Sequence, residues 1–205
     1  MSPLNLTISN LTLTRCAAHC DRSAEACNSF TYNKQTQVCQ LGAWAEQTPS
    51  PTSNADNKVY TAQAFCTTSA NFTLASNGSV STCLYLSQEN LNYSDASLAC
   101  KALGAQMYTI REMEKFHIII KALSKSKENY WIGLSDVVSE GHYVWEDDGT
   151  EITSEMKSAI FASGMPYGYS FYDCIRYVYT WFMFGDHNCA NMYKFVCEKT
   201  PTRHM

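Results

Sequence analysis

The sequence lacks the features that identify membrane-spanning and nucleic-acid-binding proteins. It has no apolar run of about 18 or more residues, so we expect no membrane span in this chain. Its formal net charge is −4 and no basic patch stands out, so nucleic acid is not an expected partner. The first residues, Met1-Ser2-Pro3, have neither the basic nor the apolar segment of a signal peptide. We therefore expect a mature or excised form, or the ectodomain of a larger receptor.

Recognisable catalytic motifs are also missing. The chain contains no H-E-x-x-H, no G-x-S-x-G and no Gly-rich phosphate-binding pattern. Five histidines and scattered acids give many accidental pairings, but none has a spacing that fixes a reaction geometry. We therefore do not expect an enzyme, and we expect no cofactor apart from the weakly bound calcium considered below.

Cysteine, by contrast, is abundant. The count is ten, which is even, and no pair forms the C-x-x-C spacing of zinc ribbons and thioredoxins. Five Asn-x-Ser/Thr glycosylation sequons accompany them. Together these features predict a secreted protein or the extracellular face of the cell surface. The cysteines are Cys16, Cys20, Cys27, Cys39, Cys66, Cys83, Cys100, Cys174, Cys189 and Cys197, and the sequons begin at Asn5, Asn10, Asn71, Asn77 and Asn92.

The distribution of polar stretches divides the chain. Residues 47–57 are polar with two prolines and read as a loop, and Lys58–Thr61 follows as a short strand. Another polar stretch comes after Cys66. We place a boundary near residue 65, which gives a domain at 1–65, a second at 66–199 and a tail at 200–205.

The first domain has four closely spaced cysteines. Cys16 and Cys20 lie on one face of a helical turn, and Phe30 and Tyr32 alternate as in a strand with one buried face. With Cys27 and Cys39, this order resembles the PAN/apple domain, a small α+β adhesion module of secreted proteins. The resemblance implies the disulfides Cys16–Cys39 and Cys20–Cys27. A generic disulfide knot is the alternative, because spacing alone does not give connectivity.

Several helices and strands are expected in the second domain. Ser94 caps a helix that continues through Leu103, with Gly104 just past its end. Residues 109–112, Thr-Ile-Arg-Glu, form a capping box for a second helix. Tyr130–Leu134 reads as a buried strand, and 143–145 and 194–197 read as further strands. The buried face of the second helix is predicted to carry Met113, Phe116, Ile120 and Leu123, with His117 at the surface.

Residues 66–199 contain a series of short motifs, which are Trp131-Ile-Gly-Leu134, Ser139 to Gly149 with Trp145, Pro166, Asp173-Cys174, Asp186-x-x-Cys189 and Phe195-Val-Cys197-Glu. In this order and spacing, they resemble the C-type lectin domain. The resemblance implies the long form of this α+β fold, with two helices, antiparallel strands and a long irregular loop region. It also implies the disulfides Cys100–Cys197, Cys174–Cys189 and Cys66–Cys83.

The calcium ligands of sugar-binding members of this family are largely replaced. Those members surround the ion with oxygen atoms on both sides of a proline, before a cysteine and in a Trp-Asn-Asp triplet, because calcium requires hard oxygen ligands. Here Met165 and Tyr167 flank Pro166, Tyr172 replaces a glutamate, and only Asp186 remains of the triplet. We therefore predict that the sugar-binding calcium site is absent.

An accessory calcium site of the family is partly retained. Asp136, Glu140 and Asp173 match three of its positions, while Gly168 and Tyr172 replace carboxylates. Three carboxylates can hold a weak calcium ion if water and main-chain carbonyls complete the shell. The alternative is that they are ordinary solvated or turn-capping acids.

Aromatic side chains take the place of the lost oxygen ligands. Tyr and Trp are enriched at interfaces, and their rings also stack on the apolar faces of sugars. A collapsed loop with its own small hydrophobic cluster is the alternative, since aromatic residues are often interior. The predicted ligand-binding residues are Met165, Tyr167, Tyr169, Phe171, Tyr172, Trp181 and Phe184.

The domains together predict a recognition or adhesion protein. We expect its partner to be a glycan or an extracellular protein, including a second copy of the chain, bound without calcium through the aromatic loop. The alternatives are a calcium-dependent lectin with an atypical site and a structural or matrix protein, since fold alone does not assign function.

Overall fold

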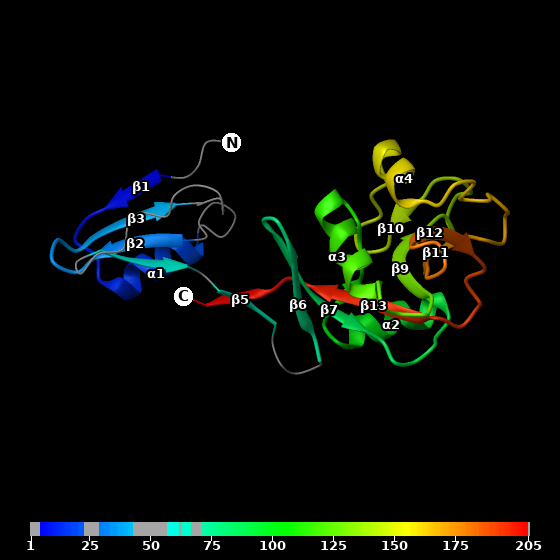
Figure 1. The fold of residues 1–205 in the computed structure, drawn as a ribbon, viewed down its shortest axis with the longest axis horizontal. Coiled ribbons are helices and arrows are strands. Elements are labelled where there is room, and N and C mark those ends of the chain that lie inside the picture. Colours follow the sequence, from blue (N-terminus) through cyan, green and yellow to red (C-terminus); the bar gives the residue numbers. More distant parts are fainter. Residues whose placement is uncertain (1–4, 23–28, 43–56, 62, 67–70, 205) are drawn as a thin grey trace. The chain divides into compact units, whose positions relative to one another are not determined.

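The computed structural model describes residues 5–22, 29–42, 57–61, 63–66 and 71–204 (Figure 1). The chain divides into two compact units, one of Met1–Phe65 with Thr202–Met205 and the other of Cys66–Pro201. Helices, sheets and disulfides occur in both, which confirms the predicted disulfide-rich α+β class. None of the helices in the described ranges has the length and apolar character needed to span a membrane.

The first unit is a four-stranded antiparallel sheet in the order β1-β3-β2-β4, with one helix packed on β2 and β3. Phe30 on β2 is paired with Leu41 on β3, and both side chains are buried with Cys16 and Cys20 of the helix. The elements are β1 (Asn5–Ile8), α1 (Leu13–Arg22), β2 (Ser29–Asn33), β3 (Val38–Gly42) and β4 (Asn57–Thr61).

One of the two disulfides predicted for this unit is described. Cys16 on α1 is bonded to Cys39 on β3, as the family resemblance implies. The prediction of Cys20–Cys27 concerns Cys27, which lies outside the described residues.

The C-terminal residues, expected to be a tail, contain a strand. The strand β14 (Thr202–His204) pairs antiparallel with β5 (Gln63–Phe65), so the chain returns from residue 201 to the segment that precedes Cys66. The Cys66–Pro201 unit is therefore inserted between two paired strands of the first unit.

The second unit is built on a sheet in the order β12-β11-β9-β13-β7-β6, with β10 paired to β9 and β8 paired to β13 (Figure 1). All of these pairs are antiparallel except the parallel β13–β9 pair. The strands are β6 (Thr73–Asn77), β7 (Val80–Leu86), β8 (Gln106–Met107), β9 (Tyr130–Ser135), β10 (Val144–Trp145), β11 (Cys174–Val178), β12 (Met183–His187) and β13 (Lys194–Lys199). The helices are α2 (Tyr93–Ala102), α3 (Met113–Leu123) and α4 (Ser154–Ile160), the last of which the sequence pattern does not indicate.

Strand β9 is buried on both faces, as its continuous apolar sequence predicts. Ile132 and Leu134 belong to one hydrophobic core, while Trp131 belongs to a second core on the opposite face. Gly133 lies between them, and a Cβ at this position would be 3.0 Å from the Cβ of Met107. The missing side chain therefore allows β8 to approach β9 closely, since real Cβ contacts are rarely so short.

The predicted helix caps are wrong in both cases. Asn92 rather than Ser94 caps α2, because its side-chain oxygen accepts a hydrogen bond from the Asp95 N–H. The cap position of α3 is Glu112, which makes no side-chain capping bond, and Thr109 lies outside the helix. The predicted position of Gly104 is correct, since this residue follows α2 with a φ of +63°.

The core face of α3 also differs in part from the prediction. Leu123 is buried as expected, and Phe116 and Ile120 are partly buried against the same core. Met113 is exposed, whereas Ile118 and Ile119 are fully buried. Because α3 packs against β6 as well as the core, its buried face is wider than a single stripe.

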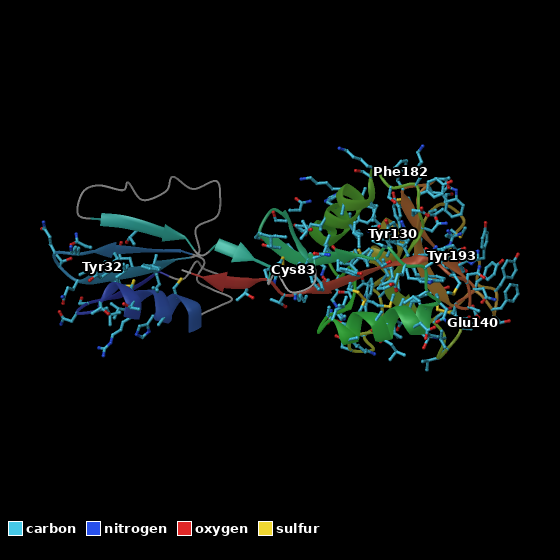
Figure 2. The ribbon with its side chains drawn as sticks, turned by 90° about the horizontal axis from the view of Figure 1, so that it is seen from below. Tyr32, Cys83, Tyr130, Glu140, Phe182 and Tyr193 are labelled. Carbon is cyan, nitrogen blue, oxygen red and sulfur yellow. A yellow bond between two sulfur atoms is a disulfide. The ribbon has the colours of Figure 1, made fainter. Side chains whose placement is uncertain are left out.

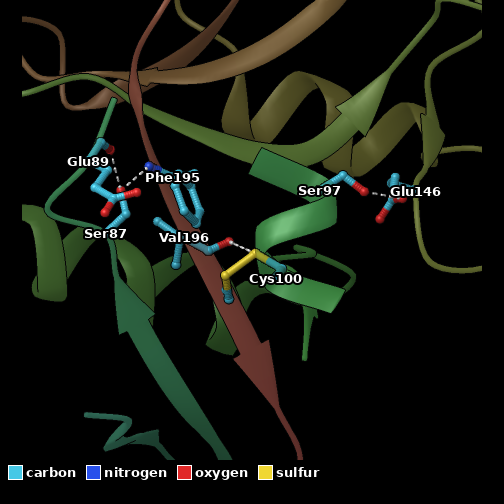
Figure 3. The surroundings of a disulfide bond; sticks show 8 residues. Ser87, Glu89, Ser97, Cys100, Glu146, Phe195 and Val196 are labelled. Carbon is cyan, nitrogen blue, oxygen red and sulfur yellow. Dashed lines mark hydrogen bonds between the residues drawn. A yellow bond between two sulfur atoms is a disulfide. The ribbon is translucent and has the colours of Figure 1, made fainter. Parts of the chain in front are cut away.

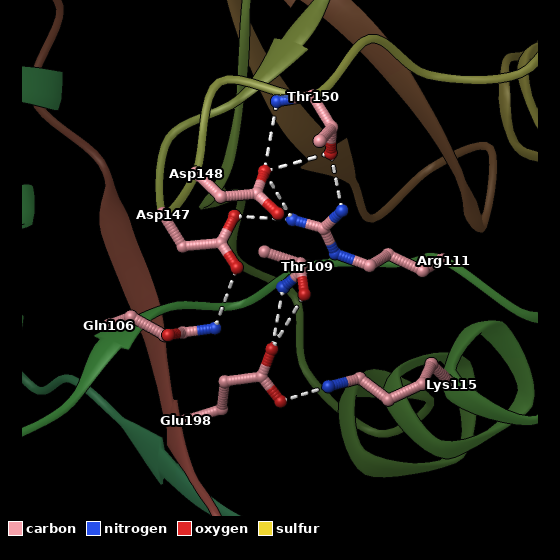
Figure 4. A network of polar contacts seen from close by, with 8 residues as sticks. All are labelled: Gln106, Thr109, Arg111, Lys115, Asp147, Asp148, Thr150 and Glu198. Carbon is pink, nitrogen blue, oxygen red and sulfur yellow. Dashed lines mark hydrogen bonds and ion pairs between the residues drawn. The ribbon is translucent and has the colours of Figure 1, made fainter.

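A buried carboxylate explains why Thr109 does not cap α3 (Figure 4). The carboxylate of Glu198 on β13 accepts hydrogen bonds from the Thr109 N–H at 2.9 Å and the Thr109 hydroxyl at 3.0 Å. It also accepts one from the Thr82 hydroxyl on β7 and forms an ion pair with Lys115 on α3. These partners compensate for the removal of the charge from water.

A second cluster of charges borders this network (Figure 4). The guanidinium of Arg111 contacts Asp147 at 2.7 Å and Asp148 at 2.8 Å. The Arg111 hydrogen bond, followed by bonds from Thr150, lowers the pKa of Asp148 to about 2. Gln106 also donates to Asp147, so these side chains fix the loop that follows β10.

Three predicted disulfides of the second unit are present, namely Cys66–Cys83, Cys100–Cys197 and Cys174–Cys189. The Cys100–Cys197 bond joins α2 to β13 across 97 residues of sequence (Figure 3). Nearby, the Ser87 hydroxyl accepts from the Phe195 N–H and donates to the Glu89 carbonyl, which fixes the chain beyond β7 to the start of β13. A bridge over so long a loop contributes about 5 kcal/mol in the chain-entropy model.

Replacing Glu198 with alanine should strongly destabilise the second unit. The change leaves Lys115 and the polar groups of Thr109 and Thr82 without their buried partner, so we expect a loss of about 3–5 kcal/mol in the free energy of unfolding. Urea unfolding followed by tryptophan fluorescence measures it. The control is Glu89→Ala, since that side chain is exposed. Equal effects of the two changes would contradict the structural role of Glu198.

Candidate functional site

The long loop between α4 and β11 is attached to β12 at two points. The Ala162 N–H donates to the Phe184 carbonyl at 3.0 Å, and the Gly168 N–H donates to the Asp186 carboxylate at 3.1 Å. Gly168 has a φ of +66°, a conformation that glycine adopts without strain. Between and beyond these points the loop has no regular hydrogen-bond ladder, and its aromatic side chains extend outward.

Three rings of this loop are half exposed and contact one another. The exposed fractions are 53% for Tyr167 and 54% for both Tyr169 and Phe171. Tyr169 and Phe171 stack with centroids 5.7 Å apart and planes 7° apart, and Tyr167 lies 5.8 Å from Tyr169. Tyr172 packs edge-on against Phe171 at 4.6 Å and stacks on His187 of β12 at 5.1 Å. Tyr172 thus connects the exposed rings to the sheet.

A pocket next to these rings is formed by two segments that are distant in the sequence. Met165 and Tyr167 from the loop and Trp181 from the β11–β12 hairpin line an open pocket of about 510 Å³. Ala162, Ser163 and Met183 complete the lining. The structure therefore brings together Met165, Tyr167 and Trp181, all of which the sequence predicts as ligand-binding residues.

Phe184 does not belong to this surface, contrary to the sequence prediction. Its side chain is fully buried, with its ring 5.9 Å from that of Tyr177. The two residues are directly paired on β11 and β12, so both side chains point into the core. A ligand at the surface cannot reach this ring.

Phe182 is an exposed ring that the prediction leaves out. Its exposed fraction is 50%, and it lies at the tip of the β11–β12 hairpin with a φ of +54° (Figure 2). Alternation along an extended strand would place Phe182 on the same face as Phe184, but Phe182 precedes β12 and lies in the turn with a positive φ, so its side chain is exposed. We define the aromatic surface as Met165, Tyr167, Tyr169, Phe171, Tyr172, Trp181 and Phe182.

Four carboxylates lie beneath and beside the loop. Asp136 and Asp186 are buried, and each has one oxygen bonded to a backbone N–H, of Gly141 at 2.8 Å and of Gly168 at 3.1 Å respectively. The second oxygen of each has no hydrogen-bond partner among the described residues. Burial raises the pKa of Asp136. Partial desolvation, followed by repulsion from Asp136, Asp173 and Asp186, raises the pKa of Glu140.

These residues do not fit the calcium site of sugar-binding lectins. Met165 and Tyr167 present a thioether and a phenol, and one Asp186 oxygen is engaged by Gly168. Across the described ranges, no three His, Cys, Asp or Glu side chains converge as metal ligands. The accessory candidates Asp136, Glu140 and Asp173 share one region. The carboxylate of Asp136 accepts a hydrogen bond from the Gly141 N–H, and the Asp136 N–H donates to the Asp173 carbonyl.

A larger groove of about 670 Å³ lies between the β6–β7 hairpin and α3. Leu74, Leu86 and Ile118 are among its lining residues, and Asn71, which begins a glycosylation sequon, also lines it. A glycan attached at Asn71 would cover this groove. We therefore place the candidate ligand site at the aromatic surface.

Comparisons with known proteins agree with the fold. Residues 89–199, which are more than half of the chain, match the model of the C-type lectin domain, and residues 2–66 match that of the PAN domain. The human CD209 antigen is 30% identical over 119 residues, which cover 58% of this chain and 28% of that protein. Lectin BRA-3 of Megabalanus rosa is 29% identical over 121 residues, which cover 57% of this chain and 70% of the lectin. C-type lectin domain family 4 member M of Hylobates lar is 29% identical over 120 residues, 58% of this chain, and the match spans only 29% of that relative.

Solved structures with the same fold include proteins of different kinds. The carbohydrate-recognition domain of mouse scavenger receptor C-type lectin superposes with a TM-score of 0.54 at 26% identity, covering 62% of this chain and 94% of that domain. A calcium-independent type II antifreeze protein superposes with a TM-score of 0.56 at 20% identity, covering 68% of this chain and 98% of the antifreeze protein. The second likeness concerns the fold alone. On the sequence match, the chain belongs to the C-type lectin domain family and carries a PAN domain ahead of its lectin-like unit.

Proposed function

We propose that the protein is an extracellular recognition protein that binds a glycan at its aromatic surface without calcium. The observation that carries this proposal is the contact between three half-exposed rings, Tyr167, Tyr169 and Phe171, next to a pocket lined by Trp181. Flat aromatic faces stack on the apolar faces of sugar rings, and Tyr and Trp lose little conformational entropy on binding.

The replacement of calcium ligands supports the calcium-independent part of the proposal. Calcium in proteins is bound by about six to eight oxygen ligands, with calcium–oxygen distances of about 2.3–2.6 Å. Met165, Tyr167 and Tyr172 cannot supply them, and Asp186 already anchors Gly168. The loop is held by hydrogen bonds to β12, so it does not need a bound ion to be attached to the sheet.

The extracellular part of the proposal is supported by the disulfides and the sequons. Four described disulfides would not persist in a reducing cytosol. Asn10 and Asn71 are exposed, and Asn77 and Asn92 are partly exposed. An N-linked glycan can therefore be accommodated at each of these positions. The lectin family to which the chain belongs is a class of binding proteins, which is consistent with a recognition role.

Binding to a panel of immobilised glycans, with calcium and again with EDTA, tests the proposed function. We expect binding that is unchanged by EDTA. Loss of binding in EDTA would contradict calcium independence and would direct mutagenesis to Asp136, Glu140, Asp173 and Asp186. No binding under either condition would contradict glycan recognition and would favour an extracellular protein partner or a second copy of the chain.

Alanine substitutions test whether the ligand binds at the aromatic surface. Tyr169→Ala and Trp181→Ala should each lower affinity about tenfold, which corresponds to roughly 1.4 kcal/mol, the upper range for a stacked ring. Because both side chains are about half exposed, the free energy of unfolding should change little. The matched control is Leu98→Ala on α2, an exposed apolar residue outside the aromatic surface. Unchanged affinity of both variants would refute this placement.

Mild acid should leave binding unchanged. Phenol and indole rings do not change charge between about pH 6 and 8, whereas calcium ligands must be deprotonated to hold the ion. Burial lowers the pKa of His187, so the ring stacked on Tyr172 stays neutral to lower pH than an ordinary histidine. We expect affinities at about pH 6 and pH 7.5 to agree within about twofold.

Protonation of the acids under the loop should not weaken binding either. Asp136 and Glu140 have raised pKa values in the folded protein. The folded state therefore binds their protons more tightly than the unfolded state, so acidification does not destabilise the fold through these two groups. A loss of binding at the lower pH that added calcium restores would contradict the proposal.

A further inference from the structure

Arg176 is a partly buried cation at the edge of the aromatic surface. It lies in the middle of β11, where it is paired with Trp131 of β9 and Gly185 of β12. Its neighbours Ile175 and Tyr177 point into one hydrophobic core. Strand alternation therefore places Arg176 on the opposite face of the sheet, towards Tyr193.

The guanidinium of Arg176 has no anionic partner among the described residues. Its Nε and Nη1 atoms are buried and make no hydrogen bond there, and no carboxylate lies within ion-pair distance. The charged group lies over the Tyr193 ring, with its central carbon 4.8 Å from the ring centroid. A desolvated cation without a counter-ion is unfavourable, and a ring face compensates only in part.

The groups around Arg176 are neutral and aromatic. His187 lies on the neighbouring strand, and burial followed by repulsion from Arg176 lowers its pKa. Its ring stacks on Tyr172 and contacts Tyr193 edge-on, while its Nδ1 is 2.8 Å from the Asn191 amide nitrogen. Tyr172 belongs to the aromatic surface, so the cation and the exposed rings share a border.

The carboxylate of Asp186, on the neighbouring strand, does not neutralise this cation. Asp186 is paired with Ile175, so it lies on the face of the β11–β12 hairpin opposite to that of Arg176. It is engaged by the Gly168 N–H. The positive charge of Arg176 is thus available to a ligand on the Tyr172 and Tyr193 side.

We propose that Arg176 binds an acidic group, a carboxylate or a sulfate ester, on the glycan that stacks on the aromatic surface. This inference rests on the proposed function and specifies its ligand class. The Arg176 side chain is partly exposed, and Nη2 is the guanidinium nitrogen that is not among its buried atoms. A charge-assisted hydrogen bond from Nη2, together with attraction from the desolvated cation, selects acidic over neutral glycans.

Matched glycan pairs test this selection in the full chain. Each pair consists of one glycan with and without its sialic acid, or with and without one sulfate ester, so the two arms separate carboxylate from sulfate. We expect at least one acidic member to bind about tenfold more tightly than its neutral counterpart. Arg176→Met should abolish this preference and leave binding to the neutral member unchanged. Arg176→Lys should retain part of the preference, because it keeps the charge but loses the planar fork.

The control is Lys125→Met, which removes one exposed positive charge from the same unit and should retain the full preference. Equal binding of acidic and neutral members by the unchanged protein would overturn the proposal, as would a preference that persists in Arg176→Met. Binding to neutral glycans in either case would leave the proposed function standing.

Inorganic sulfate provides a test that does not depend on glycan binding. Sulfate, compared with chloride at equal ionic strength, should raise the thermal unfolding temperature more in the unchanged protein than in Arg176→Met. The comparison between proteins removes the general stabilisation that sulfate gives any fold. Equal shifts in the two proteins would overturn the anion site even if no glycan on the panel binds.

Discussion

The burial of the Glu198 carboxylate constrains the whole lectin-like unit. One side chain on β13 requires partners from β7, from the segment after β8 and from α3, so these elements meet at a fixed point. A buried charge tolerates few alternative arrangements, because each missing partner leaves a desolvation cost uncompensated. The adjacent Cys100–Cys197 bond attaches α2 to the same strand, so β13 connects most of the elements on this side of the sheet.

A framework fixed in this way allows the long loop to change its chemistry. The loop is attached to β12 through backbone groups and through the Asp186 carboxylate, and of its side chains Met165 packs against the core while Tyr167, Tyr169 and Phe171 are exposed. Rings at Tyr167 and Tyr172 can therefore stand in place of oxygen ligands without disturbing β11 or β12. Binding sites on loops of a rigid scaffold commonly vary in this manner.

Local patterns predicted the parts of the fold that local physics determines. The continuous apolar run of β9 and the family motifs around the cysteines identify the strand and the disulfides described here. The capping box at Thr109 failed because Glu198, 89 residues further along the chain, provides a stronger acceptor. Phe182 and Phe184 differ in exposure because the turn of the β11–β12 hairpin includes Phe182 and ends before β12 begins at Met183, and the sequence does not show where this turn ends. The missing partner of Arg176 becomes visible only when the strands are paired.

The pairing of β5 with β14 gives the lectin-like unit two covalent connections to the same small ladder. Here the segments on both sides of the inserted unit, Gln63–Phe65 and Thr202–His204, are hydrogen-bonded to each other. Separating the two ends of the unit would therefore require the hydrogen bonds of this ladder to break.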